Sequence, residues 1–365
     1  MTKIKDIINY LETIAPLGYQ ENYDNAGLIT GDKSKAVTGI LLCLDALENV
    51  IEEAIQKNCN LVIAHHPIVF KGLKKINGNN YVERSIIKAI KNDIAIYASH
   101  TNLDNVLLGV NRKIAEKIGL TDLKILAPKS STLQKLVTFV PEKNTGEVLT
   151  ALHQAGAGQI GNYQNCSFRV AGTGTFEPNE AANPHIGKNN QLEEVSENRI
   201  EVIFPARLGA AIVQALKTAH PYEEVAYYLQ NIENENQEVG AGMIGNLETP
   251  MAAQDFMDFL KDRMQLSCIR HTEITDKKIA RVAVCGGAGS FLLPKALKAG
   301  ADAYVSADFK YHEFFDAENK LVIMDIGHYE SEVFTKELIY EILSKKFTNI
   351  AVNFTEQVTN PISYY

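Results

Sequence analysis

The sequence predicts an α/β core domain that is split by an inserted ferredoxin-like α+β domain. Short apolar segments alternate with amphipathic helical segments near both ends of the chain, as in parallel α/β sheets. This pattern is interrupted between about residues 126 and 246, where two halves of the interrupting segment resemble each other. Residues 1–126 and 247–365 are therefore assigned to the core domain, and residues 130–245 to the insert.

The first part of the core domain is expected to form a parallel sheet. Apolar residues recur at helical spacing near the start of the chain, which predicts a helix at residues 3–14. Alternating strands and helices then follow. The strands are expected at residues 39–44, 61–64 and 94–98, and the helices at 47–58, 82–91 and 111–118.

The middle segment has a different pattern. The stretch KLVTFVPEKNTGEVLTALHQAGA is similar to RIEVIFPARLGAAIVQALKTAHP, and each reads as strand, proline and helix. A duplicated βαβ unit of this size indicates a ferredoxin-like module. The expected strands are 135–140, 165–170, 199–204 and 224–229, the helices are 146–155 and 208–220, and a loop covers 172–190.

After about residue 246 the first pattern returns. Strands are expected at 279–285, 303–306 and 321–326, and helices at 252–264, 291–299 and 330–345. One α/β domain interrupted by an insert accounts for this return. Two successive domains without an insertion are the alternative, and a length of 365 residues suits either arrangement.

Composition narrows the classes of protein. A formal net charge of −8 disfavours nonspecific binding to nucleic acid. The five cysteines have no CxxC spacing, which argues against disulfides and a thiolate zinc site and fits a reducing cytoplasm. No window approaches the ~18 consecutive apolar residues of a membrane-spanning helix, and the N-terminus lacks the features of a signal peptide.

Two of the predicted strands end in polar residues that can bind a metal. His65 and His66 follow the strand at 61–64 and precede Pro67, which can bend the chain so that both imidazoles reach one centre. His100 and Asp104 follow the next strand. The alternatives are unrelated surface histidines and an aspartate that serves only a turn.

A third pair follows the strand at 321–326. His328 and Glu332 are four residues apart at the start of a predicted helix, so they share one helical face. An ordinary helix N-terminus with favourably placed acidic residues is the alternative.

Together these residues form a plausible ligand set for transition metals. Imidazoles and carboxylates suit Zn²⁺, our first choice, as well as Mn²⁺, Fe²⁺, Co²⁺ and Ni²⁺. His65, His66, Asp104, His328 and Glu332 exceed the number of ligands that one catalytic zinc takes. A carboxylate that bridges two divalent ions would explain the surplus, and Glu332 is the candidate bridge.

Six segments together form a recognisable set of motifs. They are DNAGL at 24–28, HHP at 65–67, HTNLD at 100–104, HPYEE at 220–224, CGGAGS at 285–290, and Gly327-His328 with Ser331-Glu332. This set resembles the motifs of the NIF-three-like family, many of whose members are labelled type 2 homologues of GTP cyclohydrolase I. The resemblance covers nearly the whole chain and includes the family's long form, in which a PII- or CutA-like domain is inserted.

This resemblance implies a dinuclear centre in which Glu332 bridges the two metals. It also implies a toroidal homohexamer with the sites facing an internal cavity. The sequence departs from the family pattern at Tyr23, where many members have Trp, and at Ala307, where Gly is common. The second departure puts the loop before Asp308 in doubt.

Two classes of function fit these residues. One is a metal-dependent hydrolase of a nucleotide, with GTP implied by the family label and with His100 or Asp308 transferring protons. The other is a non-enzymatic, metal-binding hexameric scaffold or regulator that binds a small effector or nucleic acid. The CGGAGS segment is interpreted as a tight turn, and His220 as a structural residue.

Overall fold

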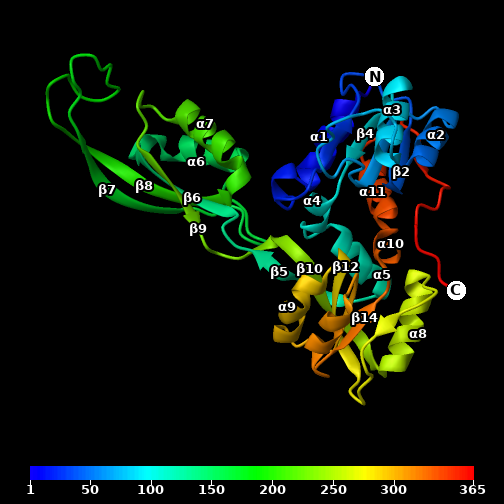
Figure 1. The fold of residues 1–365 in the computed structure, drawn as a ribbon. Helices are drawn as coiled ribbons and strands as arrows, with labels where there is room; N and C mark the ends of the chain where they lie inside the picture. The colour runs from blue at the N-terminus through cyan, green and yellow to red at the C-terminus, as the bar shows by residue number, and fades with distance from the viewer. The chain divides into compact units, whose positions relative to one another are not determined.

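The computed structural model describes residues 1–365, which form two compact units (Figure 1). The first unit contains Met1–Pro128 and Gln237–Tyr365, and the second contains Lys129–Asn236. Both units combine β-sheets with helices, so the chain has a mixed α/β fold with several sheets. None of its helices has the length and apolar character needed to span a membrane.

The first sheet of the large unit has five strands. Its order is β1 (Gly27–Thr30), β4 (Ala95–Ala98), β3 (Leu61–His66), β2 (Ile40–Asp45) and β15 (Val352–Phe354). All neighbouring pairs are parallel except β1 and β4. Because both faces of the central strands are covered, these strands are apolar runs without alternation.

Helices pack on both faces of this sheet. On one face, α2 (Glu48–Gln56) and α3 (Tyr81–Lys91) lie side by side (Figure 1) and bury an apolar cluster with β2 and β3. On the other face, α1 (Ile4–Ile14) and α11 (Thr335–Ser344) belong to the main core.

The second sheet of the large unit has six strands. Its order is β11 (Arg270–His271), β14 (Val322–Asp325), β13 (Ala303–Ala307), β12 (Ile279–Ala288), β10 (Asn236–Met251) and β5 (Thr121–Lys129). Strands β12, β13 and β14 are parallel. The helices α5 (Val110–Ile118) and α8 (Ala253–Met264) share the main core with the first sheet, and α9 (Leu293–Lys298) covers a separate cluster.

Three short elements carry the residues that follow the strands. Helix α4 (Thr101–Asp104) follows β4, and α10 (His328–Glu332) follows β14. The 3-10 segment Tyr311–Ala317 follows β13. These elements therefore lie beyond the carboxyl ends of parallel strands, where open α/β sheets place their sites.

The second unit contains a four-stranded antiparallel sheet and two helices. The strand order is β7 (Phe168–Phe176), β8 (Glu193–Pro205), β6 (Leu133–Pro141) and β9 (Tyr227–Ile232). Helices α6 (Thr145–Gln154) and α7 (Gly209–Ala219) lie on the same face of this sheet (Figure 1) and bury an apolar cluster against it.

Three sequence-based expectations require correction. Residues 172–176, expected in a loop, extend β7 because they pair with Glu193–Glu197 of β8, and such cross-strand pairing outweighs a low local β-propensity. Asp104, for which a turn was the alternative, ends the short helix α4, whose first amide donates to the distant Asp24 carboxylate. The single helix expected at 330–345 is divided into α10 and α11.

The packing of Gly109 behind α4 leads to a prediction. A Cβ atom on Gly109 would lie 1.8 Å from the backbone oxygen of Leu103 in α4. We expect Gly109→Ala to lower the free energy of unfolding by about 1–3 kcal/mol or more, as overpacking does, measured by urea denaturation. Gly18→Ala is the control, since no atom lies within 4 Å of its added Cβ. Equal stabilities of the two variants would contradict the expectation.

Candidate metal centre

The five predicted ligands come together inside the large unit. His65 and His66 end β3, Asp104 ends α4, and His328 and Glu332 begin and end α10. His65 and Glu332 are buried, with 0% and 3% of their surfaces exposed. Although His65 and His66 are consecutive residues, their ring centroids are only 4.9 Å apart.

His65, Asp104 and Glu332 form one group of donors. The Nε2 atom of His65 lies 3.7 Å from Asp104 Oδ1 and 3.6 Å from Glu332 Oε1. The Nδ1–H of His65 donates to the Ser99 carbonyl oxygen at 2.8 Å, which leaves a lone pair on Nε2. Both His65 Nε2 and Asp104 Oδ1 are buried without a hydrogen-bond partner. Because buried polar atoms are rarely left unpaired, this group has the character expected of a metal site.

His66, His328 and Glu332 form a second group. The Oε2 atom of Glu332 lies 2.9 Å from His66 Nε2 and 3.1 Å from His328 Nε2. The two Nε2 atoms are themselves 3.3 Å apart. The two oxygens of Glu332 therefore face different sets of donors: Oε1 faces His65, and Oε2 faces His66 and His328.

Two further carboxylates orient the imidazoles of the second group. Asp45, at the end of β2, lies 2.8 Å from His66 Nδ1, and Asp308, after β13, lies 2.7 Å from His328 Nδ1. Asp45 also accepts a hydrogen bond from the Thr359 hydroxyl at 2.6 Å. Carboxylates at Nδ1 fix the ring orientation and make Nε2 a stronger ligand, as around metal-bound histidines.

Burial and charge shift the pKa values of the donors in opposite directions. Burial raises the pKa of Glu332, but the histidines around it outweigh this effect and hold the pKa well below its usual range. Burial, reinforced by the Glu332 charge, raises the pKa of Asp104 well above its usual range. Burial also lowers the pKa of His65.

The pKa values of the other two histidines, His66 and His328, are raised. Burial alone would lower the pKa of His66, but its bonds to Asp45 and Glu332 raise it to about 10. The pKa of His328 rises to about 9 for the same reason, with Glu332 and Asp308 overcoming burial. Without a metal, both rings therefore carry protons at neutral pH, and these protons balance the buried carboxylate.

A glycine turn gives the Glu332 carboxylate its space. Gly287 has a φ of +60°, and a Cβ atom there would lie 2.5 Å from Glu332 Oε1. Its N–H donates to the Ser331 hydroxyl oxygen at 2.9 Å, and this hydroxyl donates to the His328 carbonyl oxygen at 2.8 Å. The predicted tight turn is confined to Gly287, because Cys285–Ala288 belong to β12, whose pairing register with β13 shifts between Val284 and Ala288.

His100 lies beside the five donors and has its own anchor. Its Nδ1 lies 2.7 Å from Asp24 Oδ1, and the other oxygen of Asp24 accepts from the Thr101 amide at 3.0 Å. These contacts overcome burial and lower the pKa of Asp24 to about 2. His100 borders a cavity of about 390 Å³ that is also lined by His66, Asp104, His328 and Glu332. Asp308 is not part of the cavity lining.

The donor set fits divalent metal ions. Three groups of three donors have all their ligand atoms within 4.8 Å of one another: His65 with His66 and His100, His66 with His328 and Glu332, and His65 with Asp104 and Glu332. Imidazole nitrogen and carboxylate oxygen suit zinc and other first-row transition metals.

Sequence reasoning overlooked three residues that hold this arrangement. Asp45 ends a buried strand, as His66 does, and that shared position was a usable signal. Asp24 belongs to a family motif, but its contact with His100 spans 76 positions and no local pattern predicts it. The Ser99 carbonyl oxygen is a backbone atom, so its role leaves no trace in the sequence.

The fold and site define a mixed α/β protein with a partly buried cluster of histidines and carboxylates suited to metal ions. The sequence profile of the DUF34/NIF3 family (NGG1p interacting factor 3) matches residues 2–361. A Bacillus subtilis (strain 168) protein named "GTP cyclohydrolase 1 type 2 homolog" is 39% identical over 367 residues, covering 99% of this chain and 98% of that protein. The chain belongs to the DUF34/NIF3 family.

Solved structures agree with this assignment. The chain is similar to a Bacillus cereus protein related to NIF3, with 39% identity, a TM-score of 0.87, and coverage of 100% of this chain and 99% of that one. A Staphylococcus aureus protein, SA1388, has 30% identity and a TM-score of 0.80 over the same shares of the two chains.

The raised histidine pKa values predict a pH dependence for the metal-free protein. His66 and His328 titrate at about 10 and about 9 in the folded chain, against 6.5 for an unperturbed histidine. A histidine whose pKa is higher in the folded chain than in the unfolded chain stabilises the fold. This stabilisation is complete at a pH below the pKa of the unfolded chain, and it is lost as the pH rises through the pKa of the folded chain. After treatment with a chelator, stability to urea should therefore decline from about pH 6.5 to about pH 10.

Glu332→Gln provides the comparison, because it removes the carboxylate that holds both protons. Lysines and tyrosines titrate in the same range in both proteins, so the difference between wild type and variant isolates the centre. A difference that is independent of pH over this range would show that Glu332 does not raise the pKa values of the two histidines.

Proposed function

We propose that this protein is a metal-dependent hydrolase with two divalent transition-metal ions in each chain, zinc being the first choice. The observation that carries the proposal is the placement of Glu332, whose two oxygens face different histidines at 2.9–3.6 Å. A carboxylate in this position is suited to bridge two ions. Mn²⁺, Fe²⁺, Co²⁺ and Ni²⁺ are the alternatives that the same donors accept.

The two donor groups suggest how the ligands are divided. His65 and Asp104 would hold one ion, His66 and His328 would hold the other, and Glu332 would bridge them. The unpartnered His65 Nε2 and Asp104 Oδ1 support the first assignment. Two such ions would supply the Lewis acidity that metal-assisted hydrolysis at carbon or phosphorus requires.

The residues around the donors have separate tasks in this proposal. His100 would accept or deliver the proton, because Asp24 anchors its Nδ1 and the ring borders the cavity. Asp308, the second sequence-based candidate for proton transfer, contacts His328 Nδ1 instead. An orienting role for Asp308 is therefore favoured over proton transfer.

A nucleotide is the proposed substrate, with GTP as the first compound to test. The name of the Bacillus subtilis relative suggests GTP. The aromatic lining of the cavity also suits the planar base of a nucleotide. Tyr23 and Phe70 line the cavity with ring centroids 6.1 Å apart, and their side chains are 64% and 45% exposed. Exposed aromatic rings of this kind stack on bases.

The second unit is proposed to be an inserted PII- or CutA-like domain. Its strand order β9-β6-β8-β7 corresponds to 4-1-3-2 in the module's own numbering, which is the split βαβ arrangement of ferredoxin-like domains. With it we propose the family's toroidal homohexamer and a cytoplasmic location. The five free cysteines are compatible with a reducing compartment.

Metal analysis provides the first test. Protein purified without added metal should contain about two transition-metal ions per chain, since the ligand set exceeds one zinc ion, and Glu332→Gln should lose most of both. Glu330→Gln is the matched control on the same helix, because Glu330 contacts Asn360 rather than the histidines. Absence of metal from the wild type, even after reconstitution with Zn²⁺, Mn²⁺ and Fe²⁺, would remove the basis of the hydrolase.

Turnover distinguishes the hydrolase from the alternative, a non-enzymatic metal-binding scaffold. We expect His100→Gln to retain its metal but to lower kcat about 10²–10⁴-fold, as loss of a general acid–base does. Consumption of GTP and other nucleotides by the metal-loaded protein is the measurement, with the exposed His271→Gln as control. Activity on other nucleotides alone would exclude only GTP, whereas inactivity across the whole panel would favour the scaffold.

A further inference from the structure

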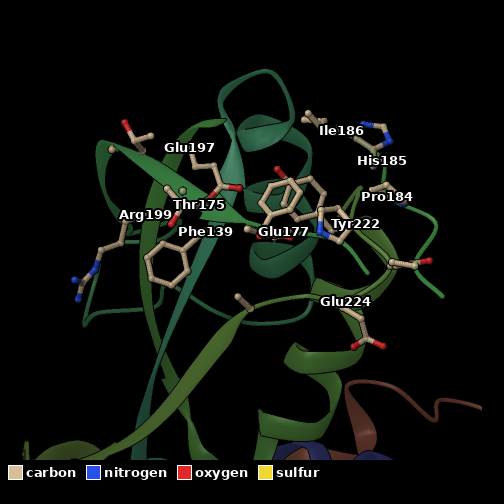
Figure 2. A pocket seen from close by; sticks show the side chains of 18 of the residues that line it. Phe139, Thr175, Glu177, Pro184, His185, Ile186, Glu197, Arg199, Tyr222 and Glu224 are labelled. Atoms are coloured by element: carbon tan, nitrogen blue, oxygen red, sulfur yellow. The ribbon is translucent and has the colours of Figure 1, made fainter. Parts of the chain in front are cut away.

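The sheet of the second unit has one face that its helices leave uncovered. Val140, Ile200 and Val202 belong to the apolar cluster beneath α6 and α7. Side chains alternate between the two faces along a strand. Phe139, Glu197 and Arg199 stand at odd separations from these residues on the same strands and therefore point to the opposite face. There the loop at 177–192 and the segment around Tyr222 border a cavity of about 630 Å³ (Figure 2).

Aromatic rings form the walls of this cavity. Phe139 and Tyr228 meet edge to face with ring centroids 5.9 Å apart, and Phe176 and Tyr222 do the same at 5.7 Å. A cavity of several hundred cubic ångströms with mostly apolar walls and a few polar groups is typical of small-molecule sites.

Two glycines of β7 give the cavity its depth. Gly172 and Gly174 line it and present no side chain. A Cβ atom on Gly174 would lie 2.1 Å from Glu197 Oε2, so the carboxylate occupies the space that glycine leaves. Gly172 differs, since no atom lies within 4 Å of its added Cβ. A side chain at Gly172 would therefore project into open cavity.

Glu197 is a buried carboxylate without a cation. Only 7% of its surface is exposed, and it forms no salt bridge. Figure 2 shows its side chain directed into the cavity towards Tyr222, while Arg199 points away. Arg199 pairs with Glu201 at 2.8 Å instead. A buried charge is costly unless it is paired, so Glu197 indicates a missing positive partner.

The Tyr222 hydroxyl lies beside the Glu197 carboxylate. Burial, with Glu197 as the next contribution, raises the pKa of Tyr222, and its hydroxyl has no well-formed hydrogen bond. The remaining carboxylates of the lining, Glu177, Glu223 and Glu224, add to the negative potential. The cavity thus combines aromatic walls with excess negative charge.

A buried histidine holds two of the walls in place. His220 donates from Nε2 to the Phe139 carbonyl oxygen at 2.9 Å, and its Nδ1 accepts from the Tyr222 amide at 3.1 Å. Burial lowers the pKa of His220, which keeps the ring neutral and suited to both roles. His220 thus ties the backbone of Tyr222 to that of Phe139, the structural role expected from the sequence.

We propose that this cavity binds a small organic cation whose positive nitrogen belongs to a planar ring, with Glu197 as its counter-ion. The ring would lie among Phe139, Phe176 and Tyr222, where aromatic faces attract a cation. Anions are disfavoured by the surrounding carboxylates. This ligand site lies in a different unit from the metal centre and does not depend on the proposed hydrolase.

Three probes with one ring skeleton test the proposal on the full-length, metal-loaded protein. They are 1-methylquinolinium (a permanent cation), quinoline (neutral at neutral pH) and quinoline-2-carboxylate (an anion). Titration calorimetry should show saturable binding of the cation, at least about tenfold tighter than that of quinoline, and no binding of the anion.

Two variants separate charge from space. Glu197→Gln should reduce binding of the cation to the level of quinoline and leave quinoline unchanged. Gly172→Val should weaken both, because its side chain fills the cavity without a clash. Glu194→Gln, an exposed position on the same strand outside the cavity, should behave as wild type. His271→Gln, an exposed position in the other unit, should also bind normally.

Three results would overturn the proposal. One is equal affinity for all three probes, and another is cation binding that survives both Glu197→Gln and Gly172→Val in folded protein. The third is failure of every probe to bind, together with a change in sedimentation coefficient on Gly172→Val. That result would assign this face to contact with another copy of the chain.

Discussion

The buried carboxylate of Glu332 is the constraint on which the rest of the site depends. A carboxylate removed from water is strongly unfavourable unless positive charge or donors surround it. His65, His66 and His328 surround this one, and the turn at Gly287 leaves it room. Positive charge on or between these histidines is therefore required to keep the carboxylate buried.

Both sheets of the large unit contribute to this balance. β3 ends in His65 and His66, and β2 ends in Asp45 behind them; β14 leads into His328, and β13 leads into Asp308 behind it. Each sheet thus supplies one or two imidazoles together with a carboxylate that orients one of them. In each sheet the parallel strands bring these residues to the carboxyl edge, and the hydrophobic core that the two sheets share holds the sheets together.

The sequence was sufficient to predict features that depend on local pattern. Buried strands without alternation predicted the parallel sheets, and the polar residues after them include the four whose side chains gather around Glu332. Features that depend on distant partners were missed or misread. β7 continues through glycines because β8 pairs with it, and α4 is helical because Asp24 caps it from 77 positions away.

The residues that orient the imidazoles were missed because their partners are distant along the chain. Asp45 and Asp24 have ordinary local surroundings, and only the folded chain brings them to His66 and His100. Short motifs can identify the side chains that are candidate metal ligands. They do not identify the groups that orient those side chains, because many backbone and side-chain groups can accept a hydrogen bond from an imidazole.

The separation between His66 and Glu332, 266 positions along the chain, has a consequence for biosynthesis. Synthesis proceeds from the N-terminus, so the histidines of β3 leave the ribosome long before the carboxylate that balances them. Until α10 is made, the two strand-end imidazoles lack the Glu332 carboxylate, and only Asp45 of β2 offers His66 a negative partner. Binding of an ion by all of these donors would therefore have to follow synthesis of α10, after the second half of the core has been made.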